Sequence, residues 1–284
     1  MTRQAYDLRG KVVLITGGTG GIGSATAREL LGRGAKVALV DVDPETPQIA
    51  SRMSSLSAMG SIADVCSRDA LDVAVADVVD RFGRVDVAIA NAGILSRAAT
   101  LRAMPMSSIE SVLAVNVSGV INTIQAVMDQ VIAHRGQFVL ISSVFAFLNG
   151  MGTIPYAMSK AAVEQFGRGL RVELAAHGVS TTVAYFSLIE TNMIKQGVDD
   201  DPVVDELLAT LPRAFLKRLQ PDTAATAIAN GLTHRSPRVM EPSRWKPISA
   251  LRGLIAPALD SHLARDRRTL AALSELDARS RTAL

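Results

Sequence analysis

The stretch Thr16-Gly17-Gly18-Thr19-Gly20-Gly21-Ile22-Gly23 decides the fold of this chain. It follows an apolar run at residues 12–15 and opens a helical pattern at residues 22–31, so the glycines lie between a predicted strand and a predicted helix. Backbone N–H groups at such a helix start face an anionic ligand, and the missing Cβ atoms let a pyrophosphate approach closely. The turn therefore predicts a dinucleotide site.

Short apolar runs alternate with helical patterns along the chain beyond this turn. The predicted strands are residues 12–15, 37–41, 61–64, 85–90, 137–142 and 181–186, and the predicted helices are residues 22–31, 47–57, 68–82, 107–134 and 156–177. This alternation is typical of βαβ units, which form a parallel sheet with helices on both faces and ligand sites at the carboxyl ends of the strands. We predict an α/β fold, a Rossmann-type doubly wound parallel sheet.

Composition favours one large domain in an intracellular protein. A chain of 284 residues with 48% hydrophobic content buries a substantial core, and we assign residues 1–240 to that domain and residues 241–284 to a helical C-terminal extension. The single cysteine, Cys66, excludes an intramolecular disulfide, and we see neither a signal sequence nor an apolar run of transmembrane length. We therefore expect a cytoplasmic protein.

The charges and histidines favour neither nucleic acid nor a metal as a ligand. The last 72 residues carry 13 basic and 6 acidic side chains, yet they contain no basic patch interleaved with aromatic residues and no nucleic-acid-binding module. His134, His177 and His234 stand near predicted helix ends, where a cation suits the helix dipole, and His262 is distant in sequence. Metal binding is the alternative reading of these histidines, and we predict no metal site.

A second motif, Tyr156-Ala157-Met158-Ser159-Lys160, is suited to moving a proton. Tyr156 and Lys160 are four residues apart, so on a helix they share a face. An unperturbed tyrosine titrates near pH 10, and a neighbouring ammonium favours its phenolate form. The spacing therefore indicates a tyrosine prepared for acid–base chemistry.

These motifs in this order resemble the short-chain dehydrogenase/reductase family over about residues 8–240. Thr16-Gly17, Gly21 and Gly23 match the family's T-G-x-x-x-G-x-G turn, and Asn91-Ala92-Gly93 matches its N-A-G motif. The family's remaining catalytic positions are matched by Asn116, Ser143, Tyr156 and Lys160.

The resemblance implies a role for each of these four residues. Tyr156 would carry the proton while hydride moves to or from a nicotinamide ring, and Lys160 would lower the Tyr156 pKa and hold the nicotinamide ribose hydroxyls. Ser143 would donate a hydrogen bond to the substrate oxygen. Asn116 would anchor a water that links Lys160 to solvent.

Asp41 decides the predicted cofactor. It closes the second predicted strand, eighteen residues after Gly23, where a carboxylate accepts from both adenosine ribose hydroxyls and opposes a 2'-phosphate. No cation interrupts residues 18–20 and Val42 follows the aspartate, so NAD is favoured over NADP. The alternatives are that Asp41 is a solvated turn residue or that Asp43 takes its place.

The resemblance also assigns other cofactor contacts. Asp64 and Val65 resemble the family's adenine-edge pair, and Ile189 and Thr191 fit the positions that grip the carboxamide and phosphate. Phe186-Ser187 replaces the family's usual proline and glycine, which leaves the local backbone path open. The predicted cofactor site is Gly17, Thr19, Gly20, Gly21, Ile22, Gly23, Asp41, Asp64, Val65, Asn91, Ala92, Gly93, Tyr156, Lys160, Ile189 and Thr191.

The predicted substrate region is apolar. Residues 144–155, between Ser143 and Tyr156, carry no fixed charge, and Leu188, Met193 and Ile194 belong to a substrate lid that we predict at about residues 188–219. Such walls suit a hydrophobic secondary alcohol or ketone of steroid, terpenoid or lipid type, although core packing explains the same side chains.

The C-terminal extension has an apolar stripe at helical spacing, interrupted by Pro257 and accompanied by arginines. We expect it to pack on the parent domain or on a partner subunit; the alternative is a helix on a membrane surface. Helices 107–134 and 156–177 match those that related proteins pair across a two-fold axis, so we predict a homo-oligomer.

Together these features predict an NAD-dependent oxidoreductase acting on a hydrophobic secondary alcohol or ketone. A second enzyme class, dehydration or epimerisation on a related fold, is disfavoured by the glycine spacing and the short substrate region. The alternative outside enzymology is a nicotinamide-binding regulator or scaffold, because a fold alone does not fix a function.

Overall fold

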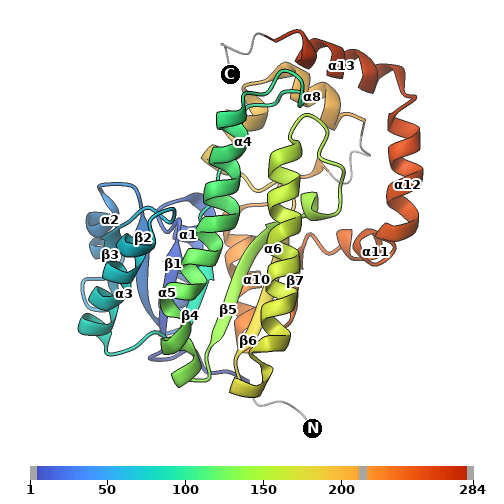
Figure 1. Cartoon of the computed structure of the whole chain (residues 1–284). Helices are drawn as coiled ribbons and strands as arrows, with labels where there is room; N and C mark the ends of the chain where they lie inside the picture. The colour runs from blue at the N-terminus through green and yellow to red at the C-terminus, as the bar shows by residue number, and fades with distance from the viewer. Residues whose placement is uncertain (1–4, 211–215, 280–284) are drawn as a thin grey trace.

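The computed structural model of the chain describes residues 5–210 and 216–279. Within them, seven parallel strands form one sheet in the order β3-β2-β1-β4-β5-β6-β7 (Figure 1). The strands are β1 (Val12–Thr16), β2 (Lys36–Asp41), β3 (Ala58–Ile62), β4 (Val87–Ala90), β5 (Gln137–Ser143), β6 (Ser180–Phe186) and β7 (Arg238–Glu241). The predicted doubly wound parallel sheet is confirmed.

The direction of winding reverses next to β1. The chain builds outward from β1 through β2 to β3 and then crosses to the other side of β1 to form β4. Val13, for example, pairs with Val37 of β2 on one side and with Val87 of β4 on the other. Loops that leave the carboxyl ends of β1 and β4 therefore diverge, and a crevice for a ligand opens between them.

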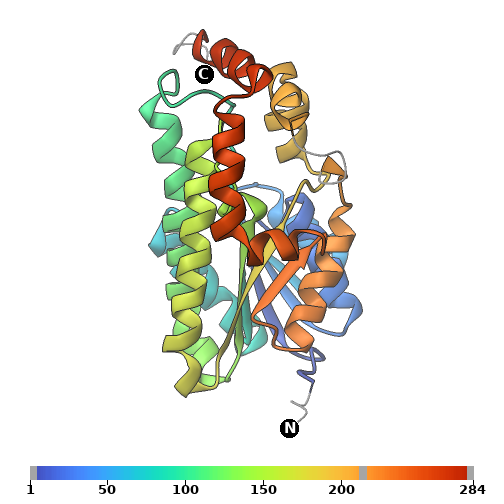
Figure 2. The same ribbon diagram turned by 90° about the vertical axis from the view of Figure 1, so that its right-hand side faces the viewer.

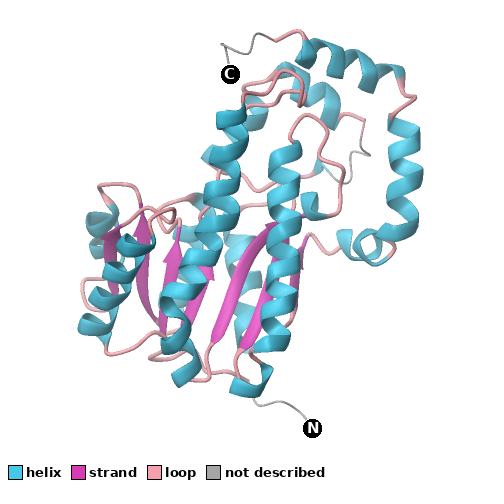
Figure 3. Cartoon of the chain, in the orientation of Figure 1, coloured by secondary structure: helices cyan, strands magenta, loops and turns pink. Residues whose placement is uncertain are grey.

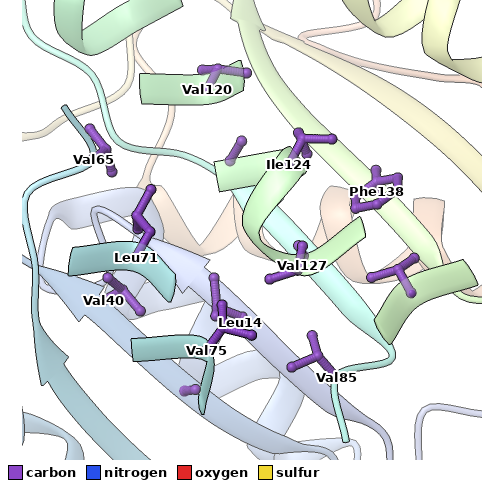
Figure 4. Packing of buried hydrophobic residues seen from close by; sticks show 14 of the residues in the cluster. Leu14, Val40, Val65, Leu71, Val75, Val85, Val120, Ile124, Val127 and Phe138 are labelled. Carbon is purple, nitrogen blue, oxygen red and sulfur yellow. The ribbon is translucent and has the colours of Figure 1, made fainter. Parts of the chain in front are cut away.

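Helices cover both faces of the sheet (Figure 3). One face carries α3 (Arg68–Phe82), α5 (Gly119–Ala133) and α6 (Ile154–Glu173), and the other carries α1 (Gly21–Gly32), α2 (Thr46–Met53) and α10 (Pro221–Thr233). On the first face Leu71 and Val75 of α3 meet Ile124 and Val127 of α5 over the strand residue Leu14 (Figure 4). These side chains are buried, so each helix fixes the loop that precedes it at the edge of the crevice.

The helix expected at residues 107–134 contains a wide turn. It runs as α4 (Met106–Leu113), a π-helical turn (Ala114–Ser118) and α5 without a break. Within the described residues, the 28-residue segment Met106–Ala133 is long and apolar enough to cross a membrane, by length and composition alone. The expectation that no segment reaches this length is wrong, because serines and asparagines scattered through the segment interrupt its apolar residues. Val120, Ile124 and Val127 nevertheless pack into the core of the sheet.

Two predicted elements next to β2 are shifted. β3 begins three residues and ends two residues earlier than expected, because Ala58 pairs with Val37 and Ile62 pairs with Asp41. The helix before it ends at Met53 rather than residue 57, since Ser54 adopts an extended conformation that leads into the strand. Both errors arise because pairing with β2 overrides local sequence preference.

The chain beyond β6 surrounds the carboxyl ends of the strands. A lid of α7 (Asn192–Ile194), a π-helical turn (Lys195–Asp199) and α8 (Pro202–Leu208) follows β6; residues 211–215 of the predicted lid lie outside the described residues. β7 was not predicted because a four-residue edge strand gives little periodic signal. It leads into α11 (Trp245–Ala250), α12 (Arg252–Leu263) and α13 (Arg267–Asp277), which pass beside α6 and over the lid (Figure 2).

Candidate active site

The glycine turn closes tightly against the end of β1. Gly17 has φ +63°, and a Cβ there would lie 2.8 Å from the Cα of Ala92. A Cβ on Gly23 would lie 2.2 Å from the carbonyl oxygen of Gly17, so α1 approaches the strand only because the residue is glycine. Gly20 caps α1 without a side chain, which leaves the first N–H groups of the helix facing the crevice.

Side chains at the ends of neighbouring strands hold this turn in place. The Asn91 amide donates to the carbonyl oxygens of Thr16 (3.0 Å) and Gly17 (2.9 Å), which ties β4 to β1. Asp41 accepts from both the backbone N–H (2.9 Å) and the hydroxyl (2.7 Å) of Thr19, so its carboxylate lies at the mouth of the turn. Asp64 accepts from the N–H of Cys66 (2.8 Å) just after β3.

A cleft of about 580 Å³ runs along these strand ends. It brings together every predicted cofactor residue except Gly23, which lies behind the turn against Gly17. The open helix start, the glycine surface and the two carboxylates, Asp41 and Asp64, fit the pyrophosphate, ribose and adenine of a dinucleotide. The residues present therefore fit a nicotinamide cofactor.

The segment after β6 closes the far side of this cleft. Phe186 still pairs with Ser143 of β5, and the Ser187 N–H donates to the Glu241 carbonyl of β7 (3.2 Å). Strand pairing thus continues at the two positions where the resemblance led us to expect proline and glycine. Thr191 then lies directly over the glycine turn, because a Cβ on Gly21 would come 2.6 Å from its methyl group.

Ser143 and Tyr156 lie together at one end of the cleft. Ser143 is the last residue of β5, and its hydroxyl donates to the Phe186 carbonyl (3.2 Å) and accepts from the Phe145 N–H (3.2 Å). The Phe145 ring meets the Tyr156 ring edge to face, with centroids 5.8 Å apart. Burial raises the pKa of Tyr156, while a side-chain hydrogen bond with Ser143 lowers it.

Lys160 lies one helical turn after Tyr156 on the inner face of α6. Its Nζ donates to the Ile141 carbonyl (3.0 Å) and lies 5.4 Å from the centroid of the Tyr156 ring. Burial lowers the Lys160 pKa from 10.5 to about 8. In the chain by itself desolvation determines the direction of the Tyr156 pKa, so the lowering of this pKa by Lys160 stays a prediction.

We expect Lys160→Met to stabilise the cofactor-free protein while removing its activity. Below pH 8 the folded chain holds a buried charge that costs about 1–3 kcal/mol, and methionine fills similar space without it. Between pH 8 and about 10.4 the unfolded chain binds the proton and the folded chain does not, so rising pH stabilises the parent protein. Denaturant unfolding at several pH values should therefore show that the variant has a higher free energy of unfolding than the parent protein, and that this difference shrinks above pH 8. A difference that does not change with pH would contradict the assignment of a buried charge to Lys160.

Asn116 positions the surrounding segments. It lies in the π-helical turn and is fully buried, with its amide oxygen accepting from the Ile94 N–H (2.8 Å). Its amide nitrogen donates to the Ile94 carbonyl (2.9 Å) and to the Ser159 hydroxyl (3.1 Å). Asn116 thereby joins the loop after β4 to the helix that carries Tyr156; the water that it was expected to anchor stays a prediction.

A second, apolar cavity of about 130 Å³ adjoins the cleft. Ser143, Tyr156, Ser187, Met193 and Ile194 line both spaces, so the two meet at the hydroxyl groups of Ser143 and Tyr156. Within residues 5–210 and 216–279 no charged side chain lines this cavity. A substrate in the cavity would therefore present its reacting carbon at the point where the cleft begins.

Three residues of the C-terminal extension line this cavity, which the sequence analysis did not predict. Trp245 of α11 and Leu259 and Leu263 of α12 form part of its wall. The apolar stripe of the extension was the available signal, but periodicity does not tell which surface a stripe covers. Across the part of the chain that the structure describes, no cluster of three His, Cys, Asp or Glu side chains is arranged to hold a metal.

The sequence is similar to those of several known dehydrogenases. A sequence model described as short chain dehydrogenase matches residues 11–202. The 2-(R)-hydroxypropyl-CoM dehydrogenase of Xanthobacter autotrophicus is 31% identical over 210 residues, covering 72% of this chain and 84% of that protein. The (2S)-[(R)-hydroxy(phenyl)methyl]succinyl-CoA dehydrogenase subunit BbsD of Thauera aromatica is 32% identical, and the match covers 78% of this chain and 88% of that protein.

Two reductases are also similar. The 3-oxoacyl-[acyl-carrier-protein] reductase FabG of Escherichia coli is 30% identical over 222 residues, covering 78% of this chain and 90% of that protein. The crystal structure of 3-ketoacyl-(acyl-carrier-protein) reductase from Brucella melitensis complexed with NADH has a TM-score of 0.70 at 23% identity, covering 82% of this chain and 97% of that one. This structural likeness shows a shared fold.

Proposed function

Because the chain belongs to the short-chain dehydrogenase family, whose members are nicotinamide-dependent oxidoreductases, we propose that it uses NAD to interconvert a hydrophobic secondary alcohol and its ketone. One observation carries this proposal: the dinucleotide-shaped cleft and the uncharged cavity meet at Ser143 and Tyr156. A hydroxyl group in the cavity would lie beside a proton carrier at the edge of the cofactor site.

The side chains at this junction divide the work of the reaction. The nicotinamide cofactor, when bound, accepts or supplies the hydride. Tyr156 takes the hydroxyl proton of the alcohol or returns it to the ketone oxygen, and Ser143 orients that oxygen by hydrogen bonding. Lys160, at the inner end of the cleft, supplies the positive charge that opposes the burial of a phenolate.

The direct test is a screen of hydrophobic ketones with NADH and of the corresponding alcohols with NAD. Consumption or formation of the reduced nicotinamide is followed by its absorbance. We expect turnover with uncharged ketones and none with phosphorylated or polyhydroxylated ones, since the cavity offers no charged partner in the described residues. Preference for phosphorylated substrates would contradict the proposed substrate class.

We expect NAD to bind at least about tenfold more tightly than NADP, a difference of about 1.4 kcal/mol. Asp41 lies at the mouth of the glycine turn, where its carboxylate would accept from the ribose and repel a 2'-phosphate. Calorimetry on Asp41→Ser should show a smaller difference between the affinities for NAD and NADP. The control Asp43→Ser, which changes a nearby aspartate, should leave that difference unchanged. Equal affinities of the parent protein for NAD and NADP would contradict the proposed preference for NAD.

We also expect a homo-oligomer built on α5 and α6. Val172 and Met158 of α6 are 76% and 53% exposed, which suits an apolar face covered by a second copy. Light scattering should give a multiple of 30.0 kDa, and Val172→Glu should shift the mass toward that of the monomer. A monomeric parent protein at micromolar concentration would contradict this expectation.

A further inference from the structure

The C-terminal extension forms one side of the apolar cavity. Trp245 is 3% exposed and its ring lies 6.0 Å from the Phe147 ring, while Leu263 is 5% exposed. Leu259 and Leu263 are four residues apart on α12, so both reach the cavity from one face of the helix. Leu254 of the same helix is 77% exposed and lies outside the cavity wall.

Polar contacts fasten α12 at two places beside the site. Arg252 donates to both carboxylate oxygens of Glu164 at 2.8 Å, which attaches the start of α12 to the helix that carries Tyr156. Asp260 accepts from the Asn149 amide at 2.8 Å, which attaches the same helix to the loop between Ser143 and Tyr156.

The end of α13 is fastened to the lid and to the loop after β4. The Arg279 guanidinium donates to both carboxylate oxygens of Asp201 (2.6 and 2.5 Å) and to the Ala98 carbonyl (2.7 Å). Asp277 accepts from the Thr100 hydroxyl at 2.6 Å. Arg279 holds the Asp201 pKa below its usual range, so this pair stays ionised at neutral pH.

Apolar packing joins α13 to the lid helix. Leu276 is fully buried in a cluster with Val203 and Leu207 of α8. Leu207 also lines the cavity, so α13 supports a wall that faces the substrate. A Cβ on Gly152 would lie 3.1 Å from Leu276, which places the extension directly against the loop that precedes Tyr156.

We propose that residues 245–279 are a fixed roof that covers one side of the apolar cavity to form the substrate compartment and selects a compact, uncharged substrate with no coenzyme or protein carrier attached. The proposal rests on the proposed function and assigns specificity to Leu259, Leu263 and Trp245. The roof is attached to four separate segments around the site, so it is part of the folded domain. A carrier chain bearing phosphates would need cationic contacts, and no cation is found along the described lining of the compartment.

Trp245 allows a test that does not depend on turnover. It is the only tryptophan of the chain and it lines the compartment, so its fluorescence reports what enters. We expect saturable changes with methyl ketones of increasing length, affinity rising about fourfold per methylene until the compartment is full and falling beyond that length. A 3-oxoacyl-CoA thioester should leave the signal unchanged.

Substitutions on opposite faces of α12 test the roof itself. Leu259→Ala should move the length at which affinity falls to ketones about two methylenes longer. Leu254→Ala, an equal truncation on the exposed face, should leave that length where it is. An identical length limit in the parent protein and in Leu259→Ala would overturn the proposal.

The fastening is tested by neutralising both partners of the Arg279–Asp201 pair. In Arg279→Met with Asp201→Asn no charge is left buried alone, so the chain keeps its fold while the lid is released. We expect longer ketones to be admitted and the coenzyme A thioester to bind at least tenfold better than to the parent, with exposed Arg265→Met as the unchanged control. Tight binding of the thioester to the parent protein would overturn the proposal.

The two proposals fail differently in these measurements. If the Trp245 titration shows a length limit but no ketone accepts hydride, the proposal of the roof stands and the oxidoreductase assignment of this site is wrong. If long or carrier-linked ketones are turned over as efficiently as short ones, the oxidoreductase assignment stands and the proposal of the roof is wrong.

Discussion

Tyr156→Phe is expected to lower kcat by about 1,000-fold or more while leaving the affinity for NAD within about twofold. The variant keeps the ring that packs against Phe145 and removes only the hydroxyl at the junction of the cleft and the cavity. Without that group no side chain accepts the substrate proton there, so the loss is in the chemical step.

The measurement is steady-state turnover on a ketone found in the screen, together with calorimetric binding of NAD. Tyr6→Phe is the matched control, because Tyr6 is a half-buried tyrosine that contacts Lys11 and Arg235, away from the cleft. It should keep the parent rate. If Tyr156→Phe retained more than a few per cent of the parent rate, the assignment of Tyr156 as proton carrier would be wrong.

Gly23→Ala should weaken cofactor binding by about 100-fold and lower the thermal midpoint. The new methyl group would lie 2.2 Å from the Gly17 carbonyl oxygen, and both atoms belong to or adjoin rigid backbone. The first turn of α1 must therefore move away from β1, which displaces the N–H groups that face the cleft.

Gly32→Ala provides a matched substitution on the same helix. A Cβ at Gly32 meets no atom within 4 Å, so alanine there should be neutral or slightly stabilising through its better helix propensity. Calorimetric titration with NAD and thermal unfolding of the two variants separate a general effect of alanine from the collision at Gly23. Equal affinities in the two variants would show that the close approach of α1 to β1 has no bearing on binding.

Local chemistry explains what the sequence predicted well. Gly17 and Gly23 signal a tight strand-to-helix turn, and Tyr156 and Lys160 lie one helical turn apart, so neighbours in sequence fix these features. The alternation of apolar runs then determined the sheet. The register of β3 depended on pairing with β2, and the four-residue strand β7 depended on β6, neither of which a single segment encodes.

Long-range contacts and solvation explain the features that the sequence did not predict. Arg279 and Asp201 are 78 residues apart and Arg252 and Glu164 are 88 apart, so the sequence revealed an amphipathic extension but not the cavity that it covers. The raised pKa of Tyr156 follows from desolvation by the residues packed around it, which the spacing to Lys160 does not report. The side-chain contacts of Asn116 likewise depend on how a π-helical turn rotates it toward Ile94.

The position of the roof along the chain bears on how such enzymes diversify. Every residue that we assign to the proton or the cofactor precedes β7, whereas Trp245, Leu259 and Leu263 follow it. Substitutions in the segment that follows β7 could thus change selectivity while the residues assigned to the reaction stay the same. Grafting residues 245–279 onto a relative would transfer substrate selectivity only if Glu164, Asn149, Thr100 and Asp201 were transferred with them, because those four anchors are scattered through the part of the chain that precedes β7.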